Sequence, residues 1–128
     1  MEKHVTSLEL SKKLKELGVK QESEFYWSKE YTGKGWVYEI KHKGYTLEVN
    51  GKEVEHLSAF LSSELGEMIP GIVEGCRVLT QKGLIGNLWY VTIETLNPES
   101  EEKKQFTAEN EAEARGKMVE YLLENNLM

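Results

Sequence analysis

Residues 88–96, with the sequence LWYVTIETL, constrain the fold more than any other stretch of the chain. The apolar residues Trp89, Val91 and Ile93 alternate with more polar ones, which is the period-two pattern of a strand with one covered face. This pattern predicts a central or near-central antiparallel strand.

A helix is predicted at the start of the chain. Thr6 and Glu9 have the spacing of a capping box, and leucines at 10, 14 and 17 line one face. Gly18 is then expected to end the helix in a left-handed conformation.

Period-two alternation then predicts a hairpin, with two runs from Ser23 onward separated by the loop at residues 32–35. Counting back from Tyr31 opposite Trp36 places seven residues on one side: Phe25, Trp27, Lys29, Tyr31, Trp36, Tyr38 and Ile40. This aromatic side is either the buried face of a sheet under helices or an exposed binding surface.

The middle of the chain contains a second hairpin signal and a second helix. Asn50-Gly51 favours a two-residue turn between a strand ending at Val49 and a weak return segment at residues 52–56. Residues 58–69 are predicted to form a short helix that ends at Pro70. Gly66 inside this helix indicates close approach of another backbone.

Two further strands are predicted at residues 75–81 and 88–96, followed by a mobile hydrophilic connector at residues 99–105. A closing helix is expected from about Thr107 or Asn110 to Asn125. We therefore expect one α+β domain spanning residues 1–128. Its antiparallel sheet would have about five to six strands with helices packed on one face, in the order α-β-β-β-(β)-α-β-β-α.

Composition excludes several functional classes from first consideration. The net charge is −6, which disfavours binding to nucleic acid, and all acidic residues are Glu. Cys76 is the single cysteine, so neither an internal disulfide nor a multi-cysteine metal cluster can form. Because there is no signal-peptide pattern and no long apolar run, we expect a cytoplasmic protein that does not enter membranes.

Two sequence blocks carry a resemblance to a known group. The first is SAFLSSELGEMIP at residues 58–70, and the second is TAENEAEARGKMVEYLLENNL at residues 107–127. The matching positions are Ser58, Ala59, Phe60, Glu64, Leu65, Gly66, Glu67 and Met68, then Glu111, Ala112, Glu113, Ala114, Arg115, Lys117 and Met118. Together with the opening helix, these blocks resemble small uncharacterised proteins encoded by tailed phages and prophages. The resemblance implies a phage accessory protein in a bacterial host, and it implies no particular activity.

The favoured function is a non-enzymatic protein–protein interaction module without cofactor or metal. The predicted contact residues for a host or phage protein, or for a second copy of the chain, are Trp27, Trp36, Tyr38 and Tyr31, because exposed aromatic patches mark partner sites.

Two alternatives belong to other classes. The aromatic hairpin with Lys29, Lys34, Lys41 and Lys43 could bind single-stranded nucleic acid. An enzyme could use Glu64 or Glu67, provided that a pocket brings His42 or His56 close to these carboxylates.

Overall fold

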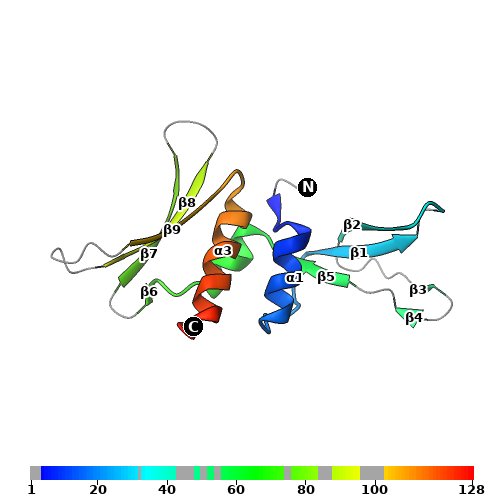
Figure 1. Ribbon diagram of the computed structural model, residues 1–128, viewed down its shortest axis with the longest axis horizontal. Coiled ribbons are helices and arrows are strands. Elements are labelled where there is room, and N and C mark those ends of the chain that lie inside the picture. The colour runs from blue at the N-terminus through cyan, green and yellow to red at the C-terminus, as the bar shows by residue number, and fades with distance from the viewer. Residues whose placement is uncertain are drawn as a thin grey trace.

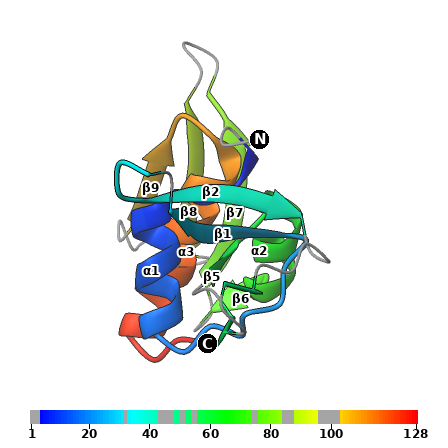
Figure 2. The same cartoon turned by 90° about the vertical axis from the view of Figure 1, so that its right-hand side faces the viewer.

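Among the described residues, three helices lie between two large antiparallel sheets (Figures 1 and 2). The computed structural model describes residues 4–31, 33–42, 48–49, 52–53, 56–73, 76–83, 88–95 and 103–128. The elements are α1 (Leu8–Glu16), β1 (Phe25–Tyr31), β2 (Trp36–His42), β3 (Glu48–Val49), β4 (Lys52–Glu53), β5 (His56–Ala59), α2 (Ser62–Met68), β6 (Ile72–Val73), β7 (Cys76–Lys82), β8 (Trp89–Thr95), β9 (Lys103–Ala108) and α3 (Glu111–Glu124).

The N-terminal sheet has the strand order β2-β1-β5. The predicted register of its hairpin is confirmed, since Tyr31 pairs with Trp36 and Phe25 pairs with His42. The second hairpin signal is also confirmed in its described part, because Glu48 pairs with Glu53 across Asn50-Gly51. Strands β3 and β4 form a separate two-stranded ribbon.

The C-terminal sheet has the order β6-β7-β8-β9, so the strand predicted at residues 88–96 is confirmed as an inner strand, β8. Val91 and Ile93 are buried against Ala114, Met118 and Leu122 of α3. On the opposite face, the Gln105 side chain donates a hydrogen bond to Thr92 Oγ1 at 3.0 Å.

The α+β class is confirmed, but the prediction of one sheet with helices on one face is wrong. The β1–β2 hairpin pairs with β5 and the β7–β8 hairpin pairs with β9, so the described strands fall into separate sheets. Each large sheet has one apolar face, and a different helix covers each face: α1 packs on β5, whereas α3 packs on β8 and β9. The helices also pack on each other, which places them in the middle of the molecule.

Two predicted boundaries are also corrected. The helix predicted at residues 58–69 begins only at Ser62, because Ser58 and Ala59 belong to β5 and pair with Tyr26 and Phe25. The predicted connector at residues 99–105 overlaps β9, whose backbone pairs with β8 from Glu94 opposite Lys103 onward. Ladder hydrogen bonds form regardless of side-chain polarity, so an exposed edge strand can be hydrophilic.

The helix ends differ in how well the sequence predicted them. The predicted capping box of α1 is wrong: Ser7 is the N-cap and its hydroxyl accepts from the backbone N–H of Leu10, whereas Thr6 is buried. Gly18 does adopt the predicted positive φ, 88°. Helix α3 begins after Asn110, one of the two predicted starts, and the Asn110 side chain accepts from the backbone N–H of Glu113 at 2.6 Å.

In the part of the chain that the structure describes, the core consists of three adjoining clusters. The first, between α1, α2 and α3, contains Leu10, Leu14, Phe60, Leu65, Ala112 and Val119. The second, between α3 and the C-terminal sheet, contains Val91, Ile93, Ala114, Met118 and Leu122. The third, under the N-terminal sheet, contains Val5, Trp27, Leu57 and Ala59.

Candidate functional site

The aromatic side of the β1–β2 hairpin is buried at one end and exposed at the other. Trp27 is only 8% exposed, Tyr38 and Ile40 are partly buried, and Trp36 is 55% exposed. The exposure increases with distance from the helices, because the hairpin extends beyond α1 (Figure 1). The aromatic side is therefore partly core and partly surface.

The N-terminal segment covers the inner end of this side. Val5 forms a β-bridge with Leu61, and the backbone N–H of Thr6 donates to the carbonyl of Phe60 at 3.0 Å. The carbonyl of Thr6 then accepts a hydrogen bond from the Trp27 indole at 3.0 Å. Trp27, one of the four predicted contact residues, is therefore a core residue.

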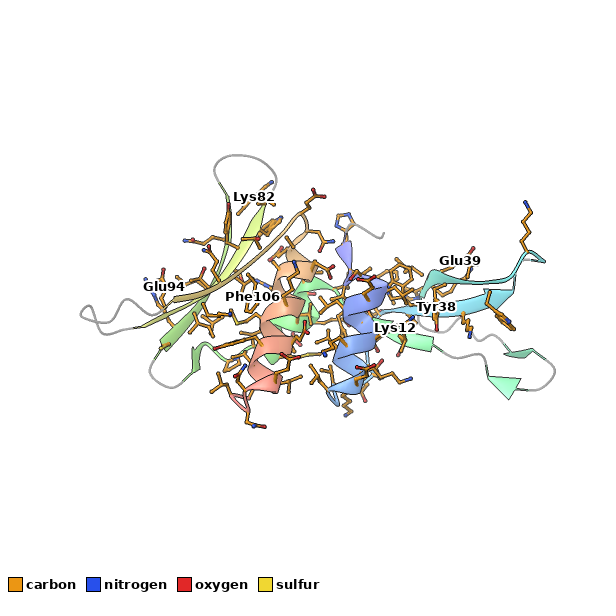
Figure 3. All side chains as sticks on the ribbon, in the orientation of Figure 1. Lys12, Tyr38, Glu39, Lys82, Glu94 and Phe106 are labelled. Carbon is orange, nitrogen blue, oxygen red and sulfur yellow. The ribbon has the colours of Figure 1, made fainter. Side chains whose placement is uncertain are left out.

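The outer end contains Trp36 and Tyr38 with two lysines above their rings. The Lys29 ammonium lies 5.5 Å from the centroid of the Trp36 ring, and the Lys12 ammonium of α1 lies 5.0 Å from that of Tyr38. Figure 3 shows Lys12 beside Tyr38 where α1 meets β2. The backbone of Tyr31 lies opposite Trp36, but its side chain is outside the part of the chain that the structure describes.

The turn at the end of the hairpin adds a third lysine. Gly33 and Gly35 have φ values of 83° and 138°, which residues with a Cβ rarely adopt, and the exposed Lys34 lies between them. We name the set Lys12, Lys29, Lys34, Trp36 and Tyr38 the hairpin-end surface.

The four lysines of the nucleic-acid alternative do not share one surface in the described residues. Lys29 and Lys34 belong to the hairpin-end surface. Lys41 alternates to the other face of β2, where its ammonium lies 3.3 Å from the Glu39 carboxylate. Lys43 is outside the described residues.

Glu64, a candidate of the enzyme alternative, has a structural role. One carboxylate oxygen accepts from the backbone N–H of Leu61 at 2.8 Å, and the other accepts from that of Glu24 at 3.0 Å. The carboxylate thus caps α2 and joins it to the segment before β1.

The remaining candidates of the enzyme alternative, as far as their side chains are described, are exposed. Glu67 is exposed on α2. His42 is exposed and lies 3.4 Å from the Glu24 carboxylate, with its ring edge-on to Phe25. The side chain of His56 is not among those described. Within the described ranges, no group of three or more potential metal-ligating side chains occurs.

Arg115 forms a polar contact for which the sequence has no direct motif. Its guanidinium donates to the Ser62 carbonyl at 2.8 Å and to Thr80 Oγ1 at 3.2 Å, and it lies 3.1 Å from the Glu111 carboxylate. It therefore joins α2, β7 and α3. The glycine at 66 was the available signal, since a Cβ there would lie 2.5 Å from Arg115 Nη1. The close approach is made by this side chain and not, as predicted, by a backbone.

A shallow hollow of about 310 Å³ adjoins Arg115 and is lined by Ile69, Pro70, Val78 and Leu79 among others. Because Ser62, Thr80 and Glu111 engage the guanidinium, its charge is already compensated within the protein. Cys76 is half-buried in the cluster between α3 and the C-terminal sheet, as expected of a small apolar residue.

Comparison of the chain with protein-family models, with curated proteins and with solved structures gave no match. In the part of the chain that the structure describes, no helix has both the length and the apolar character needed to cross a membrane.

Proposed function

We propose that this chain is a non-enzymatic accessory protein of a phage or prophage that acts in the bacterial cytoplasm by binding another protein. The hairpin-end surface is the proposed contact. The phage origin is supported by the sequence resemblance, and the binding role is supported by the geometry of the hairpin.

The exposure of Trp36 is the observation on which this proposal depends. An indole that is 55% exposed keeps a large apolar area in water. Tryptophan is also among the residues that contribute most to binding energy at protein interfaces. Trp36 lies near the end of a hairpin that extends away from the helices, where a partner can reach it (Figure 1).

Affinity capture from a bacterial host lysate, with the intact chain as bait, tests the proposal. We expect one host or phage protein to be retained by the wild type and lost with Trp36→Ala. Val37→Ala on the opposite face of β2 and Leu88→Ala before β8 are matched controls, because both remove exposed apolar side chains elsewhere. A partner that all three variants retain would contradict the proposed contact.

Self-association through the same surface is a form of this proposal in which the partner is a second copy. Analytical ultracentrifugation over a range of protein concentrations distinguishes the two forms. A wild-type dimer that Trp36→Ala converts to monomer would indicate self-association, and a concentration-independent monomer would leave another protein as the partner.

Single-stranded nucleic acid is the second candidate, favoured by the Lys29 ammonium above the Trp36 ring. Binding of this kind commonly uses several stacking rings along a basic groove. Here Trp27 is buried and Tyr38 is partly covered by Lys12. The net charge of −6 also opposes it, so a protein partner is the better supported proposal.

A further inference from the structure

We infer that the segment bound by the hairpin-end surface is acidic, with carboxylates placed around one apolar or aromatic side chain. This inference rests on the proposed function and specifies the chemistry of the partner. It follows from the charges that surround Trp36.

The three lysines of the surface differ from five other basic groups of the described residues, which are ion-paired. Lys13, Lys20, Lys41, Arg77 and Arg115 each lie within 4 Å of a glutamate carboxylate. Among the described residues, Lys12, Lys29 and Lys34 have no such ion pair; Lys12 and Lys29 lie over aromatic rings and Lys34 is exposed. In a chain with 22 acidic residues against 16 basic ones, these three ammonium groups therefore keep charge that no carboxylate within 4 Å compensates in the described residues.

The nearby acidic side chain of β2 does not neutralise this surface. Glu39 follows Tyr38 in the strand and therefore lies on the other face, where it pairs with Lys41. Figure 3 shows Glu39 and Lys12 on different sides of β2. The positive charge of the hairpin-end surface is thus available to a partner.

Trp36 and the lysines would have different tasks in such a contact. The indole provides apolar area for an anchor side chain, while the ammonium groups attract carboxylates at the rim and select against basic partners. A lysine over an aromatic ring also holds its stem against that ring, so little side-chain freedom is lost on binding.

Panning a display library of short random peptides on the immobilised intact chain tests the inference. We expect enriched peptides that combine several Asp or Glu residues with Trp, Phe or Leu. The affinity of the best peptide should fall roughly tenfold for Lys29→Glu/Lys34→Glu, since each reversed charge replaces an attraction with a repulsion. It should also fall when ionic strength rises from about 0.01 M to about 0.15 M.

The matched control is Lys82→Glu on the C-terminal sheet. Lys82 is exposed and lies 5.9 Å from the centroid of the Trp89 ring, so the substitution changes net charge and removes a similar contact at a distant place (Figure 3). Peptide affinity should be unchanged in this variant.

The outcomes separate this inference from the proposed function. Neutral or basic peptides that bind through Trp36 without salt dependence would overturn the inference and leave the proposed function standing. Failure to enrich any peptide whose binding requires Trp36 would overturn both. Salt-dependent binding of a fluorescent oligothymidylate that is lost with Lys29→Glu/Lys34→Glu would overturn both in favour of nucleic acid.

Discussion

Gly66 stands in α2 at an energetic cost, since glycine is less favourable than alanine in a helix by about 1 kcal/mol. The compensation is the Arg115 guanidinium, which occupies the space of a Cβ at this position. Its hydrogen bonds to Ser62 and Thr80 are charge-assisted and each contributes about 1.5–3 kcal/mol.

We therefore predict that Gly66→Ala changes the free energy of unfolding in opposite directions in the presence and in the absence of Arg115. In the wild-type background it should lower the free energy of unfolding by about 1 kcal/mol, because the displaced guanidinium loses more than the helix gains. In an Arg115→Ala background it should raise that free energy by up to about 1 kcal/mol. Urea unfolding of the double-mutant cycle measures both. Gly71→Ala, where a Cβ meets nothing within 4 Å, is the control, and equal effects in the two backgrounds would contradict the account.

Removal of two buried hydroxyls should change the free energy of unfolding in opposite directions. Ser58 Oγ is buried and has no hydrogen-bond partner among the described residues, whereas Thr6 Oγ1 accepts from the Phe60 backbone N–H at 3.1 Å and bonds to Ser11 Oγ at 2.8 Å. We expect Ser58→Ala to raise the free energy of unfolding by about 1 kcal/mol and Thr6→Val to lower it by about 2 kcal/mol. Chemical denaturation of both variants tests this, and a loss of stability in Ser58→Ala would show that its hydroxyl is satisfied.

Glu120 makes the stability of the fold depend on pH. Burial raises the pKa of its carboxyl, and the negative charge of Glu124 raises it further. A carboxyl whose pKa is higher in the folded than in the unfolded protein stabilises the fold below its unfolded pKa, and this contribution is lost as pH rises through the folded pKa.

Glu120→Gln should therefore raise the midpoint of thermal unfolding at neutral pH, and its advantage should vanish in acid, below the ordinary pKa of a glutamate. Calorimetry across this pH range measures the difference. Glu67→Gln on the exposed side of α2 is a matched substitution that removes one carboxylate at another place. A Glu120→Gln variant with no advantage at neutral pH would refute the assignment.

At the scale of elements, α3 is packed on two sides. Ala112 and Val119 contact the helix cluster, while Ala114, Met118 and Leu122 contact the C-terminal sheet. Gly116 allows α1 to approach, since a Cβ there would lie 2.5 Å from Leu10 Cδ2 and 3.0 Å from Thr6 Cγ2.

Gly116→Ala should consequently destabilise the protein by about 1–3 kcal/mol through overpacking, although alanine is the better helix former. Adding Leu10→Val, which shortens the contacted side chain, should restore part of the loss. Urea unfolding of the single and double variants checks both expectations. An increase in stability for Gly116→Ala alone would mean that α1 and α3 lie further apart.

An element can be predicted from the sequence when its hydrogen-bond partners lie close to it in the chain. The β1–β2 register could be derived because the two strands are joined by a short loop, and Tyr31 opposite Trp36 fixes every other pair. Strand β5 was mistaken for the start of a helix because its partner, β1, is some thirty residues away in sequence. Strand β9 was missed because its hydrophilic side chains resemble those of a connector.

At the scale of the whole molecule, the two large sheets share the helix layer. Ser7 of the α1 cap donates its backbone N–H to the Glu113 carboxylate of α3 at 3.0 Å, and Lys13 lies 3.6 Å from Glu124. The helix cluster takes residues from α1, α2 and α3. Separation of the two sheets would therefore break the shared helix cluster and expose its apolar residues to water.

This arrangement predicts that the chain unfolds in one cooperative transition. In a Trp36→Phe/Trp89→Phe variant, fluorescence reports the surroundings of Trp27 in the N-terminal sheet, whereas far-UV circular dichroism reports the whole chain. Both signals should give the same urea midpoint and slope. A second circular dichroism phase without a fluorescence change would show that the C-terminal sheet unfolds separately.

The sequence by itself determined the strand of residues 88–96, the registers of the β1–β2 and β3–β4 hairpins and most of α3, because periodicity and short loops act between near neighbours. It placed Trp27 and Trp36 on one side of the hairpin. It could not predict which of the two is buried, since both have the same period-two position. Only the tertiary structure decided that the N-terminal segment covers Trp27 and leaves Trp36 exposed. It also decided that the strands divide between two sheets and that Arg115 lies against Gly66. The physical reason is the same for all three: these contacts join segments remote in the chain, and such pairing leaves no local pattern in the sequence.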